Sequence, residues 1–509
     1  MRRLSRRLSE RTRLKSWATM LACACWLAGA EAAHAGSLLE PGTTTYTLQL
    51  ESTDPVTVGR DHNLILDTQG EMFGLVAPVV NQGTVRVKTY DDGWQEALFA
   101  VGPQVNSGQW ILGDQLVAYF VEGAVNNRSG TFQIGKDSVL SVDRDFIGGT
   151  IHGTSATSEL WAGHLSDVAL SGQVVLRSSG GSNQAASAGP TKVSGTLTVD
   201  GTLHVRSMQL ATDTALTGGG RTVLAGAWIG AAPGATGAQL TIATGHTLMG
   251  NGSLSDIALV NRGALTVEAD RTLAGNAIVT QQGAGAVMQV AGQLIANEVW
   301  LEGGVINLSG RLGASVTVEG GTLVVQDGGV VDGDLDLRAG RVSVNASSST
   351  ALWDAPVFTG DIALSDTSEL EVIVSSSSDH LLLGVNGTAK LGGKLIVTFA
   401  EGARPTAPDF LLMFEAMSDI QGTFTSVEVQ GAGDFYLRIT DRQGPLYALV
   451  ISSIPEPQTW VLLLCGLGMM TWQVRRSRSS KGSWRQCAPA LTAPTSRSAG
   501  ACSPNSTGR

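Results

Sequence analysis

Short runs of alternating apolar and polar residues, broken by glycine, fill the chain from about residue 191 onward. The segments SGTLTVDGTLHV, NRGALTVEADRTLAG and GGVINLSGRLGASVTVEGGTLVV show the pattern most clearly. Such alternation with β-branched residues predicts strands with one buried face, because successive side chains point to opposite sides of a strand. Apolar stripes of helical period are not found over any useful length. We therefore predict an all-β protein.

Two sequence echoes predict that these strands stack in successive turns. LSDVAL at 165–170 recurs as LSDIAL at 254–259, and NQGTVRV at 81–87 recurs as NRGALTV at 261–267. A loose period of about 20 residues fits the turns of a parallel β-solenoid and is too short for a propeller blade. Asn81 and Asn261 would then lie at corners, where a stacked Asn satisfies backbone groups and tolerates left-handed angles. The predicted fold is a right-handed parallel β-solenoid.

The N-terminus predicts export. A basic stretch, MRRLSRRLSERTRLK, precedes the apolar run SWATMLACACWLAGA. The small residues Ala33 and Ala35 then fit a signal-peptidase site before Gly36. We expect a signal helix that the export machinery recognises and signal peptidase removes.

The segment SIPEPQTWVLLLCGLGMMTWQVRRSR, residues 453–478, predicts a single transmembrane helix. Its 16 residues from Thr459 to Val474 carry no charge, somewhat fewer than the roughly 20 residues that usually span a bilayer. Arg475, Arg476 and Arg478 follow at once, and the positive-inside rule keeps them in the cytoplasm. The body of the chain would then lie outside the inner membrane, in agreement with the N-terminal signal.

The order of these features resembles the PEP-CTERM sorting signal of Gram-negative bacteria. Pro455, Glu456 and Pro457 match its tripeptide, and the apolar span and arginine cluster follow as in that family. The resemblance implies cleavage by an exosortase, a transient inner-membrane stage, and delivery to the cell surface or extracellular matrix with exopolysaccharide as a partner. One departure is the polar tail at 479–509, since the family usually stops just after the arginines.

A change in composition marks the end of the predicted solenoid. Residues 361–452 contain longer and more aromatic strands, and they resemble the end segments of bacterial surface solenoids and autotransporter passengers. The residues that match this pattern are Leu391, Gly392, Gly393, Leu395, Val397, Pro405, Phe410, Leu412, Gly422, Phe424 and Val427. Such a segment would cap the open end of the rod, where unpaired strand edges favour aggregation.

These boundaries divide the chain into seven segments. SSGGSNQAASAG at 178–189 has the composition of a flexible linker, although a surface loop on a continuous rod explains it equally well. The predicted segments are a signal peptide (1–35), an irregular β-rich region (36–177), a Gly/Ser-rich loop or linker (178–190), a β-solenoid (191–360), a β-rich capping segment (361–453), a sorting signal with a transmembrane helix (454–478) and a disordered basic tail (479–509).

Charge and cysteine content restrict the partners of the body. Residues 36–453 contain 20 Lys/Arg against 41 Asp/Glu, which gives a net charge of about −21. Such a surface repels nucleic acid and anionic lipid. No cysteine lies in this range, so the exported body needs neither disulfides nor a thiolate metal site.

The sequence offers little catalytic or metal-binding chemistry. Its seven histidines are scattered, and we find no nucleophile elbow, phosphate loop or dinucleotide fingerprint. The best metal candidates are Asp332, Asp334 and Asp336 in DGGVVDGDLDL, because alternate aspartates on a strand share a face, as in Ca²⁺ sites or glycosidase carboxylate pairs. The motif occurs once, whereas Ca²⁺-binding repeats form arrays. We expect a solvated acidic face, no cofactor and no enzymatic activity.

Together these features favour an exported, non-enzymatic surface or matrix protein of a biofilm or exopolysaccharide layer. One alternative is a secreted solenoid that binds or acts on polysaccharides. A second is an adhesin resembling autotransporter passengers, which is disfavoured because no run of barrel strands follows the body.

Overall fold

The computed structural model describes thirteen stretches of the chain. These are residues 38–39, 41–47, 49–68, 72–89, 96–178, 189–346, 357–374, 380–400, 409–431, 435–443, 446–453, 463–465 and 467–470. The chain forms two compact units, 1–453 and 454–509, and each is described by itself. In the second unit, residues 463–465 and 467–470 are helical. No helix of the described residues has the length and apolar character needed to cross a membrane.

All described strands belong to the first unit. Its N-terminal part contains β1 (Leu38–Leu39), β2 (Gly42–Thr47), β3 (Gln49–Glu51), β4 (Val56–Val58), β5 (His62–Asp67), β6 (Met72–Val76), β7 (Val79–Asn81), β8 (Thr84–Lys88), β9 (Glu96–Val101), β10 (Gln104–Asn106), β11 (Gln109–Leu112), β12 (Leu116–Val121), β13 (Val125–Asn126), β14 (Thr131–Ile134), β15 (Val139–Ile147) and β16 (Thr150–Ser178). The middle part contains β17 (Thr191–Val199), β18 (Thr202–Thr217), β19 (Arg221–Ala231), β20 (Gln239–Ile242), β21 (Thr247–Ser255), β22 (Ala258–Asn261), β23 (Ala264–Val267), β24 (Thr272–Gly275), β25 (Ile278–Gln281), β26 (Val287–Val290), β27 (Gln293–Leu301), β28 (Val305–Leu308), β29 (Arg311–Val318), β30 (Thr322–Val325), β31 (Val330–Val331), β32 (Leu335–Leu337) and β33 (Arg341–Ala346). The C-terminal part contains β34 (Val357–Phe358), β35 (Ile362–Leu364), β36 (Glu369–Val374), β37 (His380–Val385), β38 (Ala389–Leu391), β39 (Lys394–Phe399), β40 (Asp409–Ala416), β41 (Ile420–Gly422), β42 (Ser426–Gln430), β43 (Phe435–Gln443) and β44 (Leu446–Ser453).

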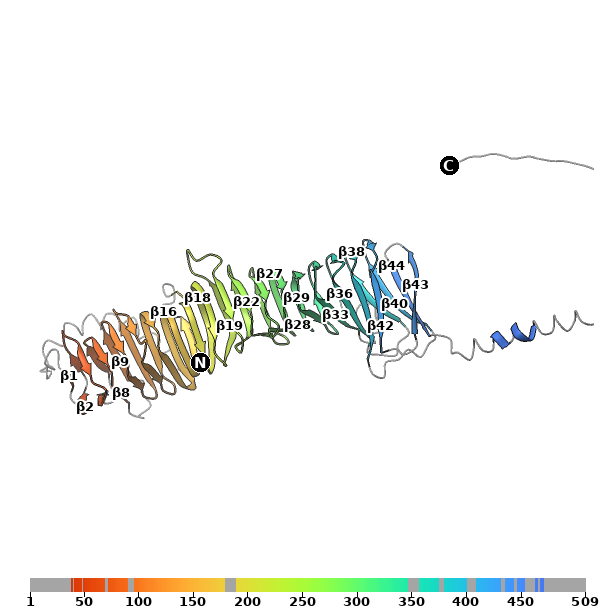
Figure 1. The fold of residues 1–509 in the computed structure, drawn as a ribbon. Helices are drawn as coiled ribbons and strands as arrows, with labels where there is room; N and C mark the ends of the chain where they lie inside the picture. Colours follow the sequence, from red (N-terminus) through yellow and green to blue (C-terminus); the bar gives the residue numbers. More distant parts are fainter. Residues whose placement is uncertain are drawn as a thin grey trace, which may run out of the picture. The chain divides into compact units, whose positions relative to one another are not determined.

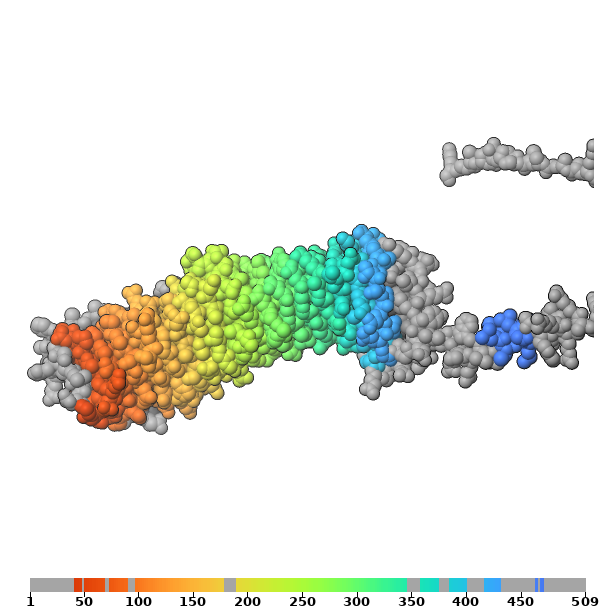
Figure 2. All heavy atoms as spheres, viewed as in Figure 1, coloured from red at the N-terminus to blue at the C-terminus, as the bar shows by residue number. Residues whose placement is uncertain are grey.

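These strands coil into a parallel β-solenoid of about 15 turns, which confirms the predicted class (Figure 1). Most turns contribute three strand segments, although long strands such as β16 run through the corners, and up to β42 each segment pairs in parallel with its counterpart on the next turn. The columns start as β1–β4–β7, β2–β5–β8 and β3–β6–β9. In Figure 2 the sequence colours follow one another in order along the stack, because each turn contacts mainly its neighbours.

Inward-facing apolar residues form the core, one layer per turn. In the second column Leu64 pairs with Val85, Val85 with Trp110, and Trp110 with Phe132, and each of these side chains is at most 1% exposed. The Trp110 and Phe132 rings stack with centroids 5.7 Å apart. Alternation along β29 and β30 places every second residue in the core, as the sequence predicts. The pattern of period two therefore specifies which face of each strand is buried.

Buried amides stack at the corners between strands. Asn106 and Asn127 continue a ladder that starts at Asn81, and Asn261 stacks on Gln281 with an Nδ2–Oε1 distance of 2.6 Å. The prediction that Asn81 and Asn261 satisfy backbone groups at corners is confirmed. Neither residue has a positive φ, so these corners do not make use of the tolerance of Asn for left-handed angles.

Left-handed backbone occurs instead at aspartates in the other sequence echo. Asp167 and Asp256 have φ values of 53° and 56°. The Asp167 Oδ1 atom accepts a hydrogen bond from the Thr196 backbone N–H on the next turn, at 3.0 Å. A short carboxylate thus compensates for the strained angle by capping a backbone donor that the corner leaves free.

A small second hydrophobic cluster lies apart from the core, on the third column. Val117, Val139 and Trp161 are each about 8% exposed or less, and Tyr119 packs against them. Their strand neighbours Ala118 and Leu140 point into the core, so the cluster faces outward.

The C-terminal end of the stack changes from parallel to antiparallel pairing. β44 pairs antiparallel with both β40 and β43, whereas all other pairs between described strands are parallel. The parallel columns continue across residue 361, since β33 pairs with β36, β36 with β39 and β39 with β42. Likewise β16 and β17, on either side of the glycine-rich stretch, pair with each other.

Candidate functional site

The residues predicted to direct export and sorting lie outside the described part of the structure. They are Ala33, Ala35 and Gly36 at the signal cleavage site, Pro455, Glu456 and Pro457 in the tripeptide, and Arg475, Arg476 and Arg478 after the apolar span. Their roles stay predictions from the sequence.

The three aspartates considered for a cation site do not converge. Asp332 follows β31 and contacts Arg311 on the preceding turn, and its Oδ1 atom accepts a hydrogen bond from the Thr359 hydroxyl at 2.8 Å. Asp334 Oδ1 accepts the backbone N–H of Asp361 at 2.9 Å. These carboxylates are therefore already engaged by the scaffold.

The expectation that the three carboxylates share a strand face is wrong. Gly333, with φ of 159°, lies in the corner between β31 and β32, so Asp332 and Asp336 belong to different columns. Asp336 forms an ion pair of 2.8 Å with Arg338. The hydrogen bond from Arg311 lowers the pKa of Asp332, and Thr359 adds to this effect. Across the described residues, no group of three or more His, Cys, Asp or Glu side chains could hold a metal ion.

Asp145, His164 and Ser194 form a hydrogen-bonded relay on three successive turns. His164 Nδ1 lies 2.9 Å from Asp145 Oδ1, and His164 Nε2 lies 2.8 Å from Ser194 Oγ. This is the order of an acid, a base and a nucleophile in serine hydrolases, which is recognised by geometry rather than by sequence position. The relay is the candidate functional site with the most defined chemistry.

The strand register explains why these side chains meet. Asp145 pairs with His164, and His164 pairs with Lys192, two positions before Ser194. The intervening Val193 is 1% exposed and points into the core, so positions 192 and 194 both face outward. The relay therefore crosses the outer face of the first column.

A glycine directly follows the serine. Gly195 has a φ of 70°, and a Cβ atom there would lie 2.2 Å from Asp167 Oδ1. The strand register shifts at this point, between Ser166 and Val168 of the preceding turn. Only glycine fits this bend, which interrupts the regular pairing of β17 just beyond Ser194.

A second histidine–serine pair lies on a neighbouring part of β16. His152 Nδ1 lies 3.0 Å from Ser171 Oγ. No carboxylate contacts His152 in the described part of the chain. The pair thus has the spacing of a base and a hydroxyl but lacks the orienting acid.

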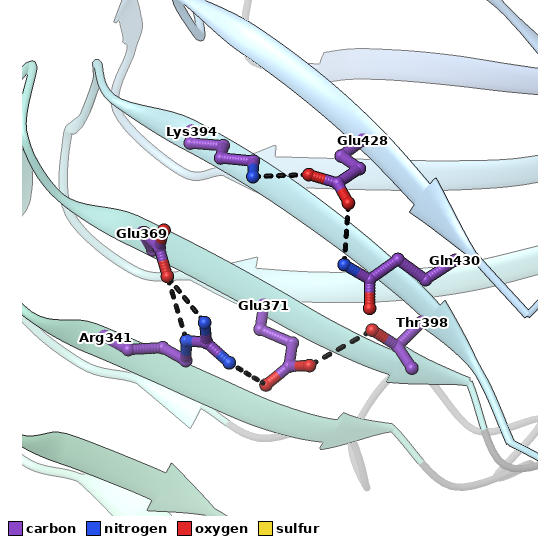
Figure 3. A network of polar contacts seen from close by, with 7 residues as sticks. All are labelled: Arg341, Glu369, Glu371, Lys394, Thr398, Glu428 and Gln430. Atoms are coloured by element: carbon purple, nitrogen blue, oxygen red, sulfur yellow. Dashed lines mark hydrogen bonds and ion pairs between the residues drawn. The ribbon is translucent and has the colours of Figure 1, made fainter.

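An extended polar network covers the outer face of β33, β36, β39 and β42 (Figure 3). Arg341 donates two hydrogen bonds to Glu369 Oε2, of 3.0 and 2.7 Å, and lies 3.6 Å from Glu371 Oε2. The Thr398 hydroxyl donates to Glu371 at 3.0 Å. Further along, Lys394 pairs with Glu428. Hydrogen bonding to Glu369 raises the pKa of Arg341.

A half-buried tryptophan lies on the outer face of the second column. Trp300 Nε1 donates a hydrogen bond to Glu298 at 3.0 Å, and the Arg338 guanidinium lies 5.6 Å from the ring centroid. In register beside it are Thr280 and Thr317, and the nearby Ile278 side chain is 43% exposed. A flat aromatic and hydroxyl-bearing surface of this kind suits contact with a sugar ring.

Sequence reasoning missed the Asp145–His164–Ser194 relay. The residues are separated by 19 and 30 positions, because the second interval contains the stretch 179–188 that lengthens one turn. A fixed period therefore cannot place the serine beside the histidine. Only the strand pairing across that stretch brings them together.

Comparison with protein-family models, curated proteins and solved structures finds no match to the chain.

Proposed function

We propose that this chain is an exported bacterial surface or extracellular-matrix protein, sorted and cleaved at a PEP-CTERM-like signal. The observation that carries the proposal is the position of the boundary between the two units. The first unit ends at Ser453 and the second begins at Ile454, directly before Pro455, Glu456 and Pro457. Cleavage at the tripeptide would release the solenoid without breaking any of its strands.

The solenoid suits a structural role outside the cell. Its core runs through successive turns and needs no disulfide or cofactor, since apolar layers and parallel hydrogen bonds hold neighbouring turns together. Its coil is expected to be right-handed, as nearly all parallel crossovers are. The net charge of the body, about −21, favours solubility in a hydrated polysaccharide layer and disfavours nucleic acid as a partner.

Mass spectrometry of the mature protein in its native host tests this proposal. We expect a new N-terminus at Gly36, a C-terminus near Pro457 and recovery from the surface or matrix fraction. Glu456→Ala should leave the uncleaved protein in the inner membrane, whereas Gln458→Ala, just outside the tripeptide, should not. An intact basic tail on the surface-exposed protein would contradict cleavage, and a cytoplasmic location would contradict export.

A second candidate function is carbohydrate binding, favoured by the outward-facing Trp300 with its flanking threonines. Because aromatic rings stack on the apolar faces of sugars, Trp300→Ala should abolish binding that a glycan array detects. Trp110→Phe, in the core, serves as a control that leaves this surface intact. Equal glycan binding by the wild type and Trp300→Ala would remove this candidate.

A further inference from the structure

We propose that Ser194 is an activated nucleophile that takes the acyl group of small esters, with His164 as its base and Asp145 as a positioning residue. This inference goes beyond the proposed function, which assigns no chemistry to the body. It rests on contacts among described residues and is independent of the sorting signal.

The hydrogen-bond partners of His164 define its productive tautomer. The Asp145 carboxylate can only accept, so the Nδ1 atom at 2.9 Å carries the proton. In the neutral imidazole Nε2 then has a free lone pair, which accepts the Ser194 hydroxyl proton at 2.8 Å. This is the arrangement that general-base activation of a serine requires.

The scaffold holds the relay in place. Leu165 and Val193 are buried to 0% and 1% exposure and anchor the two strands from which His164 and Ser194 project. Gly195 bends the chain immediately afterwards, and the Asp167 carboxylate fixes that bend through the Thr196 N–H. Positions on paired strands hold catalytic geometry more precisely than loops do.

The relay is open to solvent, which defines the substrates that can reach it. The side chains of His164 and Asp145 are 29% and 53% exposed. Small esters can approach such a surface directly. Solvent partly screens the contact between Asp145 and His164, so the carboxylate acts through orientation of the ring together with its charge.

The chemical steps balance with an ester and water alone. Ser194 Oγ attacks the ester carbonyl carbon while its proton passes to His164 Nε2. The bond from carbon to the leaving oxygen breaks, and His164 returns the proton to the released alcohol. Water then attacks the acyl-serine, His164 takes its proton and gives it to Ser194 Oγ, and a carboxylic acid leaves.

Labelling with a fluorophosphonate tests the proposal, because this probe phosphonylates activated serines. On the full chain we expect one adduct, which peptide mapping places at Ser194. Ser194→Ala should lose it, and His164→Gln should slow labelling at least roughly tenfold. Asp145→Asn should also slow labelling and change its pH profile, which a purely structural role of the carboxylate would not do.

Ser171 supplies a matched control, since it pairs with His152 without an acid. Ser171→Ala should label as the wild type does. Thermal melting of each variant establishes that it is folded. The proposal is overturned if Ser194 stays unlabelled in the folded protein, or if it labels no faster than Ser171 and independently of His164. Surface delivery, measured separately, is unaffected by either outcome.

Discussion

Asn81 donates a hydrogen bond of 2.7 Å from Nδ2 to Oδ1 of Asn106 on the next turn, and both side chains are at most 2% exposed. Asn106 repeats this contact with Asn127 at 2.6 Å. The Oδ1 atoms of Asn81 and Asn106 also accept the backbone N–H groups of Gly83 and Gly108. Each of these two amides thus accepts a backbone N–H at the corner of its own turn and fixes the register of the next turn.

Replacement of the middle amide should break this ladder. Asn106→Ala removes the acceptor for Asn81 and the donor for Asn127, and it leaves the Gly108 N–H without its side-chain partner. Buried polar groups that lose a partner each cost about 1–3 kcal/mol, so we expect a loss of about 2–4 kcal/mol. Denaturant unfolding followed by circular dichroism measures the total effect, and hydrogen exchange shows whether it is confined to neighbouring turns.

Asn126 is the control for that experiment, because it neighbours the ladder but is only partly buried. Asn126→Ala should change the free energy of unfolding by less than about 0.5 kcal/mol. Equal losses for the two variants would show that the ladder contributes no specific stability.

A glycine at a tight corner should be far less tolerant than one on an open surface. Gly149 has a φ of 67°, and a Cβ atom there would lie 1.8 Å from the Asn127 carbonyl oxygen. Gly149→Ala should therefore cost about 3 kcal/mol or more, through both the angle and the clash. Around Gly219 no atom lies within 4 Å of such a Cβ. Gly219→Ala should be neutral or stabilise by up to about 1 kcal/mol. Melting temperatures that fall equally in the two variants would contradict this contrast.

The fold is predictable from the sequence because its cause is local. Alternation along a segment such as RLGASVTV determines which side chains enter the core, and stacking follows from the repetition of that pattern. The echo LSDVAL and LSDIAL places Leu165 and Leu254 in the same column, each two residues before a left-handed aspartate.

The two copies of the other echo lie in different columns. Asn81 ends a strand of the first column, whereas Asn261 ends a strand of the second. Both asparagines accept the N–H of the glycine two residues later. The motif therefore specifies a corner, but it does not specify which of the three columns that corner follows.

The candidate site is not predictable in the same way. Contacts between turns depend on the length of every turn, and these lengths vary. Arg311 meets Asp332 at a separation of 21 residues, whereas Arg341 meets Glu369 at 28. A charge pattern read at one fixed period therefore assigns the wrong partners, which is why the aspartates at 332–336 looked like an unpaired acidic face.

Acidification should weaken the fold through His246. Its side chain is fully buried, with Nε2 3.0 Å from the Thr222 hydroxyl, and burial lowers its pKa. Because the folded state disfavours the charged ring, its contribution to stability is complete above the unfolded pKa of about 6.5 and is lost as the pH falls below it. The melting temperature should therefore drop between about pH 7 and pH 5, and His246→Gln should reduce that drop. An unchanged pH dependence in this variant would show that other groups cause it.

Calcium should not stabilise the solenoid at Asp332, Asp334 and Asp336. Each carboxylate already has a partner in the scaffold, and Ca²⁺ needs six to eight oxygen ligands that converge. Addition of millimolar Ca²⁺ should leave the melting temperature unchanged in the wild type and in Asp336→Asn. A rise in the wild type that Asp336→Asn removes would restore the cation site.

Loss of Arg341 should lower the stability of the solenoid, and this loss should become smaller as the salt concentration rises. Arg341→Gln leaves Glu369 and Glu371 with like charges on the same face of β36, two positions apart. The Arg341 side chain is 40% exposed, so solvent screens the ion pairs and the expected loss is only about 1 kcal/mol at low salt. Arg341→Lys keeps the charge but not the paired geometry of the guanidinium, so it should recover part of the stability that Arg341→Gln loses.

Lys390→Gln is the control, because it makes the same change of net charge on a lysine that has no ion pair among the described residues. Melting curves in low and high salt should show that the defect of Arg341→Gln shrinks as salt rises while Lys390→Gln stays near the wild type. A defect that is equally large in high salt would mean that packing of the arginine stem, rather than its charge, stabilises these turns.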